Sequence, residues 1–203
     1  MADLSAVNLV GESIVGLLRQ RRSLMAASGT LGPVPASQDI AHIPVAKLAS
    51  GSPPTSGLSL TCYQINRSDH SPARIAQSDP ENSIGISLEL SYLLACWSST
   101  VVDELAMMSW AMLELNRYAT LDQGQLLGGT SWERGETIQI APEQASFEQL
   151  SRIWDGFKQK YRLSTLFRAR VIRIGYGPAD DGPPVVASRF GFEHGDPATE
   201  AAL

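Results

Sequence analysis

Residues 83–97, which read SIGISLELSYLLACW, constrain the fold more than any other stretch of this chain. Apolar residues occupy every second position from Ile84 to Leu94, and small or polar residues stand between them. Successive side chains of a β-strand point to opposite faces of the sheet, so this period predicts a strand with one buried face and one polar face. Burial of such a face is worth on the order of 10 kcal/mol before chain entropy is subtracted. Glu89 lies on the polar face, where we expect it to be solvated or paired with an arginine of another strand.

Three segments have the apolar spacing of helices. The first covers residues 4–22, with Asp3 or Ser5 as its cap. A second helix runs from Ser99 or Thr100 to about Arg117. The third follows Pro142 and opens on a capping box. In the first helix, the spacing places Arg19, Arg21 and Arg22 in the last turn. In the second, it predicts a buried stripe of Leu105, Met108, Met112 and Leu115, with Val101 and Ala111 beside it. In the third, Ser146 and Gln149 form the capping box, and the buried face consists of Phe147, Leu150, Ile153, Trp154 and Phe157.

The remaining segments predict a small mixed β-sheet. Residues 28–57 are rich in Pro, Gly and Ser and predict a long loop with a short extended piece at 40–48. Further strands are expected at 58–65 and 163–174, shorter ones at 121–129 and 137–140, and one more at 185–192. Helices and strands occur in mixed order, which predicts an α+β fold with helices packed on the sheet. We divide the chain into a domain at residues 1–176 and a C-terminal extension at 177–203.

Composition narrows the class of protein. The chain of 203 residues is 43% hydrophobic, which is enough for a core, and its net charge of −5 argues against a general nucleic-acid binder. No run of about eighteen apolar residues occurs, so we expect no membrane insertion. No secretion signal is visible, and Cys62 and Cys96 are predicted to be buried free thiols. These features predict a cytoplasmic protein.

The chemistry-bearing residues form no recognisable constellation. His42, His70 and His194 fall in predicted loops or in the tail and are interpreted as surface residues. The turn Gly175-Tyr176-Gly177 is followed by Pro178, Asp180 and Asp181, whose carboxylates would repel a phosphate. Asp180-Asp181-Gly182 lacks the ligand spacing of an EF-hand loop. We therefore expect no catalytic residue, metal site or cofactor, and no enzyme.

Five short segments, in order, resemble the cap or tail-terminator proteins of phage-tail-like contractile injection systems of the antifeeding-prophage and virulence-cassette type. They read LSLTCYQINR, ISLELSYLLACW, MMSWAMLELNRY, EQLSRIWDGFKQKYRLS and LFRARVIRI. With the opening helix, the resemblance covers residues 4 to about 174. No single segment is diagnostic, and the specificity comes from their order.

The resemblance implies a structural protein with a fold similar to that of phage tail terminators. Members of the family form a six-fold ring that closes the tube and the contractile sheath at the end opposite the baseplate, in a particle assembled in the cytoplasm. The implied partners are other copies of the chain in a homohexamer, the terminal sheath subunits and the terminal inner-tube subunits.

A ring requires two different patches on each subunit. Arginines exposed on the last long strand, facing an acidic surface, would be one way to fix the rotation between subunits. A strand edge or an extended arm could hold the last sheath layer, with residues 28–57 and 185–192 as candidates. The candidate partner-binding residues are Arg168, Arg170, Arg173, Val185, Val186, Arg189, Phe190 and Phe192.

Two alternatives remain open. The chain could be another ring or adaptor of the same particle, such as a baseplate or tube-initiating component. It could also be a small hydrolase or nucleotide-binding enzyme, which a deep pocket with a histidine or paired carboxylates would support.

Overall fold

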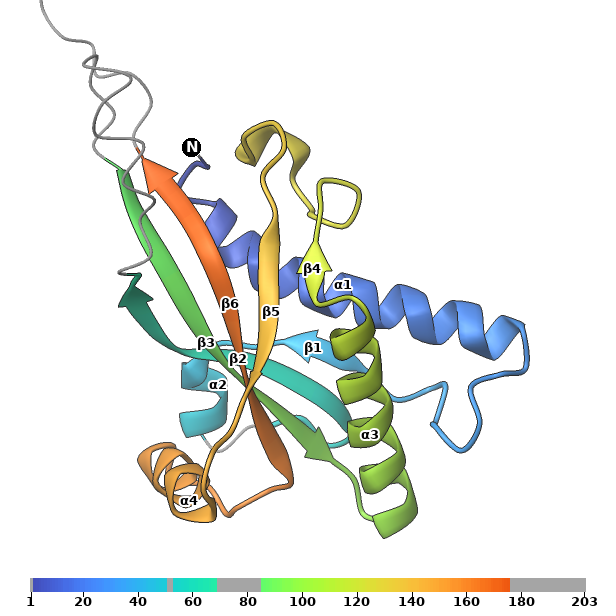
Figure 1. Ribbon diagram of the computed structural model, residues 1–203. Helices are drawn as coiled ribbons and strands as arrows, with labels where there is room; N and C mark the ends of the chain where they lie inside the picture. Colours follow the sequence, from blue (N-terminus) through green and yellow to red (C-terminus); the bar gives the residue numbers. More distant parts are fainter. Residues whose placement is uncertain (1, 51–52, 69–84, 176–203) are drawn as a thin grey trace, which may run out of the picture.

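A computed structural model describes residues 2–50, 53–68 and 85–175 of the chain (Figure 1). In this part, six strands form one sheet with the order β1-β2-β3-β6-β5-β4. Strand β1 pairs in parallel with β2, and the other neighbouring strands are antiparallel. The elements are α1 (Ala6–Ala27), β1 (Ile40–His42), α2 (Val45–Ala49), β2 (Gly57–Arg67), β3 (Gly85–Trp97), α3 (Val101–Arg117), β4 (Thr120–Leu121), the 3-10 helix η2 (Gly129–Ser131), β5 (Ile138–Glu143), α4 (Phe147–Gly156) and β6 (Ser164–Gly175). The predicted α+β fold with helices on a mixed sheet is confirmed.

Strand β3 lies in the middle of the sheet and is buried on both faces. One set of alternating residues, including Leu90 and Tyr92, packs in a core with α1 and α3. The interleaved set, including Leu93 and Ala95, packs in a second core with α2 and α4. The sheet is therefore the middle of three layers (Figure 1).

The prediction that one face of β3 is polar and exposed is wrong, because helices cover both faces of the sheet. Ser87 and Ser91 are buried on the face that was expected to be polar. Conversely, Ile86 was placed in the buried set and is 43% exposed. The other end of that predicted run, Ile84, lies outside the described residues.

A bulge in β6 determines which of its side chains enter the core. Leu88 of β3 pairs with Ile172, whereas Leu90 pairs with Ala169, so one residue of β3 opposes two of β6. The extra residue shifts the alternation, which places both Ala169 and Ile172 in the core with α1 and α3. The same shift keeps Arg173 on the opposite face, where a strict alternation continued from Ala169 would have turned it inward.

Helix α1 is longer than the apolar pattern predicted. It continues to Ala27, so Arg19, Arg21 and Arg22 lie inside the helix and not in its last turn. Ser5 is the N-cap residue, but its side chain makes no cap hydrogen bond. Asp3 supplies the acceptor instead, because its Oδ1 accepts hydrogen bonds from the backbone nitrogens of Ser5 (2.8 Å) and Ala6 (3.2 Å).

The predicted caps of the other two long helices are confirmed. The hydroxyl of Thr100 accepts from the backbone nitrogen of Asp103, and Ser146 and Gln149 form a reciprocal capping box.

The segment predicted as a long loop is partly integrated into the fold. Strand β1 adds to the edge of the sheet, and Ile40 in it is 1% exposed. Helix α2 follows and buries Leu48 completely in the core with α4. Within residues 28–57, the segments that form β1 and α2 are therefore packed into the domain and do not form a free arm.

Candidate functional site

Helix α3 exposes a row of large aliphatic side chains. Leu105, Met112 and Val101 were predicted to be in the buried stripe and are 53%, 42% and 69% exposed. Val102 and Leu113 extend the same surface, each 68% exposed. We call these five residues the α3 surface. A row of this kind on a helix that already has a buried face is typical of an interaction surface.

The prediction failed because α3 is apolar on more than one side. Met108, Ala111 and Leu115 are buried as expected, but Met107 and Trp110 occupy the rest of the core-facing side. Spacing alone cannot choose between two apolar stripes on one helix.

A hollow of about 500 Å³ adjoins the C-terminal half of α3. It is lined by Met112 and Leu113 of α3 and by Pro142 and Phe167 of the neighbouring strands, together with Ser109 and Asn116. The α3 surface therefore continues onto the sheet.

A second unpartnered surface is aromatic. Phe147, at the start of α4, is 71% exposed, although it was predicted to face the core. Its ring lies 5.2 Å from that of Tyr161, which is 41% exposed. Lys158 and Lys160, in the connection from α4 to β6, are also exposed. We call these four residues the α4 surface.

The N-terminal part of the α3 surface and the α4 surface lie at the same end of the sheet. The backbone nitrogen of Cys96 donates to the carbonyl of Leu163 at 3.0 Å, which brings the end of β3 beside the start of β6. Arg162 stacks over the ring of Trp97 at 5.5 Å between the two segments. In Figure 1 the start of α3 and all of α4 lie at the bottom, on either side of the sheet.

Arginines of β6 pair within the chain. Arg168 contacts Glu143 at 2.6 Å and Glu89 at 3.6 Å, and Arg170 contacts Glu89 at 3.6 Å. The expected pairing of Glu89 with a strand arginine is confirmed. Arg168 is only 28% exposed, so it is less accessible than the sequence suggested. The role of these arginines in partner binding stays a prediction.

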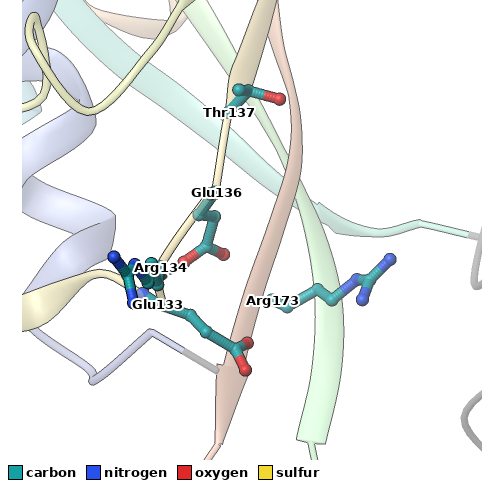
Figure 2. A pocket seen from close by; sticks show the side chains of 6 residues that line it. Glu133, Arg134, Glu136, Thr137 and Arg173 are labelled. Atoms are coloured by element: carbon teal, nitrogen blue, oxygen red, sulfur yellow. Dashed lines mark hydrogen bonds between the residues drawn. The ribbon is translucent and has the colours of Figure 1, made fainter.

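Arg173 borders a separate polar hollow of about 420 Å³ (Figure 2). Glu133, Arg134 and Glu136 line it from the turn before β5, and the carboxylate of Glu136 accepts from the backbone nitrogen of Glu133 at 3.0 Å. Charges of both signs therefore border this hollow, and Figure 2 shows the guanidinium group of Arg173 directed away from the carboxylates of Glu133 and Glu136.

The outer edge of β2 is open over much of its length. Strand β1 pairs only with Leu58, Ser59 and Leu60 of β2. In the part of the chain that the structure describes, no strand pairs with the outer edge of residues 61–67. Ile65 on this stretch is 54% exposed, and an open edge of this kind can accept a strand from another chain.

The described histidine borders a hollow of about 510 Å³, which Cys62, Tyr63 and Tyr92 also line. His42 is not a surface loop residue as predicted: it ends β1, its side chain is 13% exposed, and its Nδ1 lies 3.1 Å from Glu12 Oε1. His70 and His194 lie outside the described residues, as do Tyr176, Gly177, Pro178 and the acidic turn at 180–182.

The segment 185–192, with the predicted partner-binding residues Val185, Val186, Arg189, Phe190 and Phe192, also lies outside the described residues. Within the described ranges, no group of three or more His, Cys, Asp or Glu residues is placed to hold a metal ion. None of the described helices has the length and hydropathy needed to cross a bilayer. Cys62 and Cys96 are free thiols, half-buried and buried respectively.

A three-layer α+β domain with unpartnered aliphatic and aromatic surfaces describes a candidate assembly protein. The chain belongs to the Pvc16 N-terminal domain family, whose sequence profile matches residues 9–188. The resemblance to terminators of contractile injection systems is thereby confirmed. A search of curated protein sequences finds no match.

Two of the solved structures that are similar to this chain are terminating proteins by their descriptions. One is the sheath/tube terminator of an extracellular contractile injection system, PVC, in its extended state: it is 15% identical, with a TM-score of 0.54, over 98% of this chain and 66% of that one. The other is the tube-terminating cap of the anti-feeding prophage, 16% identical, with a TM-score of 0.45, over 68% of this chain and 50% of that one. The chain thus spans just under two thirds of the length of the first structure and half of the second, and it shares the fold of the first.

Proposed function

We propose that this chain is a structural terminator of a contractile injection system, which ends the tube and holds the last layer of the sheath. The observation that carries the proposal is membership of the Pvc16 N-terminal domain family over residues 9–188. The fold shared with a sheath/tube terminator over 98% of the chain supports it. In this role the protein is not an enzyme, and rigidity of the subunit is what matters.

The proposed partners are other copies of the chain, terminal sheath subunits and terminal tube subunits. We propose a homohexameric ring, because a six-fold ring is what the family resemblance implies, and assembly of the particle in the cytoplasm. The half-buried pairs of Arg168 and Arg170 with Glu89 link β6 to β3, and the pair of Arg168 with Glu143 adds β5, so these ion pairs stiffen three strands of the sheet. Arg173 is proposed to contact a partner.

The contact to the sheath is proposed to use a strand edge or an arm. Among the described residues, β2 offers its outer edge at 61–67. The second candidate is the segment 185–192, since β1 and α2 tie much of residues 28–57 into the fold. A chain lacking residues 185–192 should co-purify with less sheath. If this shortened chain bound as much sheath as the full chain, the proposal of an arm at 185–192 would be wrong, and the edge of β2 would remain as the candidate contact.

The termination role is tested by producing the particle with and without this chain and imaging its length and its ends. We expect particles of uniform length with the chain, and a broad length distribution or sheath-free tubes without it. Uniform, capped particles in its absence would contradict the proposal.

The position of the chain in the particle separates the proposal from its nearest alternative. A small labelled fusion to the chain should appear at the end distal to the spikes. A label at the baseplate would instead identify another ring or adaptor of the same particle.

A further inference from the structure

We propose that neighbouring copies of this chain meet head to tail, with the α3 surface of one copy packed against the α4 surface of the next. This inference rests on the proposed ring and names the two patches that would build it. It assigns the interface to residues of α3 and to the connection from α4 to β6.

The two surfaces match in their apolar character. The α3 surface consists of five exposed aliphatic residues in a row along one side of the helix, with Val101, Val102 and Leu105 at its N-terminal end. The α4 surface presents two aromatic rings in mutual contact, and Phe147 is the most exposed large hydrophobic residue of the described chain. Rigid aromatic side chains that enter an aliphatic patch are the usual anchors of protein interfaces.

The two surfaces also carry opposite charges. Asp103 and Glu104 lie in the first turn of α3, among its exposed aliphatic residues. Lys158 and Lys160 come shortly before Tyr161 in the chain, and both are exposed. None of these four residues forms an ion pair with a described residue of its own chain, so two negative and two positive charges are available to a partner.

Charge also decides between the two ways in which copies could associate. If two α3 surfaces met each other, Asp103 and Glu104 of both copies would come together and repel. Two α4 surfaces would bring lysines together in the same way. Contact between unlike surfaces removes both conflicts and is the heterologous contact that a ring requires.

The layered fold allows that contact to repeat. Helix α3 packs on one face of the sheet and α4 on the other, so each subunit presents its two surfaces on opposite sides (Figure 1). A subunit can therefore bind one neighbour through α3 and another through α4. A closed ring forms when repeating the rotation between neighbours leads back to the first subunit.

Charge reversal tests the inference in the particle and in the isolated chain. The variants are Glu104→Lys, Lys160→Glu and the two combined, with Lys47→Glu on α2 as a matched change outside both surfaces. Readouts are native mass of the isolated chain and, by imaging, the fraction of particle ends that carry a cap. Because the altered residues are at least partly exposed, all variants should keep the melting temperature of the wild type within a few degrees.

We expect each single reversal to lower the fraction of assembled chain by tenfold or more. The combined variant should recover much of that fraction, because a positive charge at position 104 then faces a negative charge at position 160. Lys47→Glu should assemble like the wild type. Leu105→Ser, which changes no charge, should also weaken assembly. If both single reversals and Leu105→Ser assembled normally, the assignment of the interface would be overturned while termination by the wild type still stood. If the wild-type chain left tail length unchanged, the proposed function itself would fail.

Discussion

The indole rings of Trp97 and Trp154 meet edge to face, with their centroids 5.9 Å apart and their planes at 74°. Trp97 ends β3 and its Nε1 donates to the hydroxyl of Ser59 at 2.8 Å. Trp154 lies in α4 and its Nε1 donates to the hydroxyl of Ser164 at 3.0 Å. Because both polar atoms are satisfied and both rings are buried, this contact fixes α4 on the sheet. The backbone that carries Phe147 of the α4 surface is thus fixed relative to the sheet.

Replacing Trp154 by alanine should lower the free energy of unfolding by about 3–5 kcal/mol, the range for an aromatic residue removed from a core. The residue is 1% exposed, so the cavity would be closed to solvent. The measurement is urea unfolding followed by far-UV circular dichroism. Phe147→Ala in the same helix is the control, because a side chain that is 71% exposed should cost less than about 0.5 kcal/mol. Equal losses for both variants would show that α4 is not anchored as described.

Glu89→Ala should destabilise the protein by about 2–3 kcal/mol, because it removes the carboxylate that forms ion pairs with two arginines in a half-buried position. Arg168 keeps Glu143 as its partner, whereas Arg170 loses the carboxylate beside it. Thermal and urea unfolding would measure the change. The matched control is Glu148→Ala, whose i,i+4 pair with Arg152 is fully at the surface and is worth less than about 0.5 kcal/mol. A similar small loss for Glu89→Ala would mean that the charge cluster contributes little rigidity.

Gly57→Ala should prevent β2 from starting where it does. Gly57 has φ +99°, and a Cβ atom there would lie 1.9 Å from the backbone oxygen of Asp39, which cannot move away as a side chain can. We expect loss of soluble protein or a fall in melting temperature of more than ten degrees. Gly156→Ala is the comparison, since a Cβ there meets nothing within 4 Å and alanine favours a helix. A Gly57→Ala protein as stable as the wild type would contradict the close approach of Asp39.

Alkaline pH should destabilise the protein in part through Cys96. Burial, with a smaller contribution from the carboxylate of Glu104, raises the pKa of the Cys96 thiol to about 12. Between the ordinary thiol pKa and that value, the unfolded chain loses this proton and the folded chain keeps it, so the unfolded state binds fewer protons and stability falls as pH rises. Urea unfolding from pH 8 to 10 should show a steeper decline for the wild type than for Cys96→Ala. Parallel slopes would indicate that Cys96 titrates normally in the folded protein.

Local patterns predicted the elements of this fold because they depend on near neighbours along the chain. The alternation around Leu88–Leu90 correctly placed β3, and Ser146 with Gln149 correctly placed the start of α4. The three arginines of β6 are spaced two and then three residues apart, which is the one local sign of its bulge. Strict alternation continued from Ala169 would have turned Arg173 into the core and both Ile172 and Ile174 out of it.

The faces that matter for assembly could not be predicted, because they depend on what packs against each element. Leu105 and Met112 look like core residues by spacing, yet α1 and the sheet contact the side of α3 that carries Trp110. Glu114 looks like a surface residue, but it is 7% exposed and accepts from Arg21 Nε of α1 at 2.8 Å. Such long-range partners leave no signal in the spacing of a single helix.

The short pairing of Ala2 with the end of β6 has a practical consequence for labelling. Its backbone nitrogen donates to Arg173 at 2.8 Å, and Gly175 donates back to Ala2 at 3.2 Å, at the end of the sheet away from the starts of α3 and β6 (Figure 1). A fluorescent or affinity fusion placed ahead of Ala2 would therefore emerge far from both proposed contact surfaces. Such a fusion can report where the protein sits in a particle without obstructing the contacts that would build the ring.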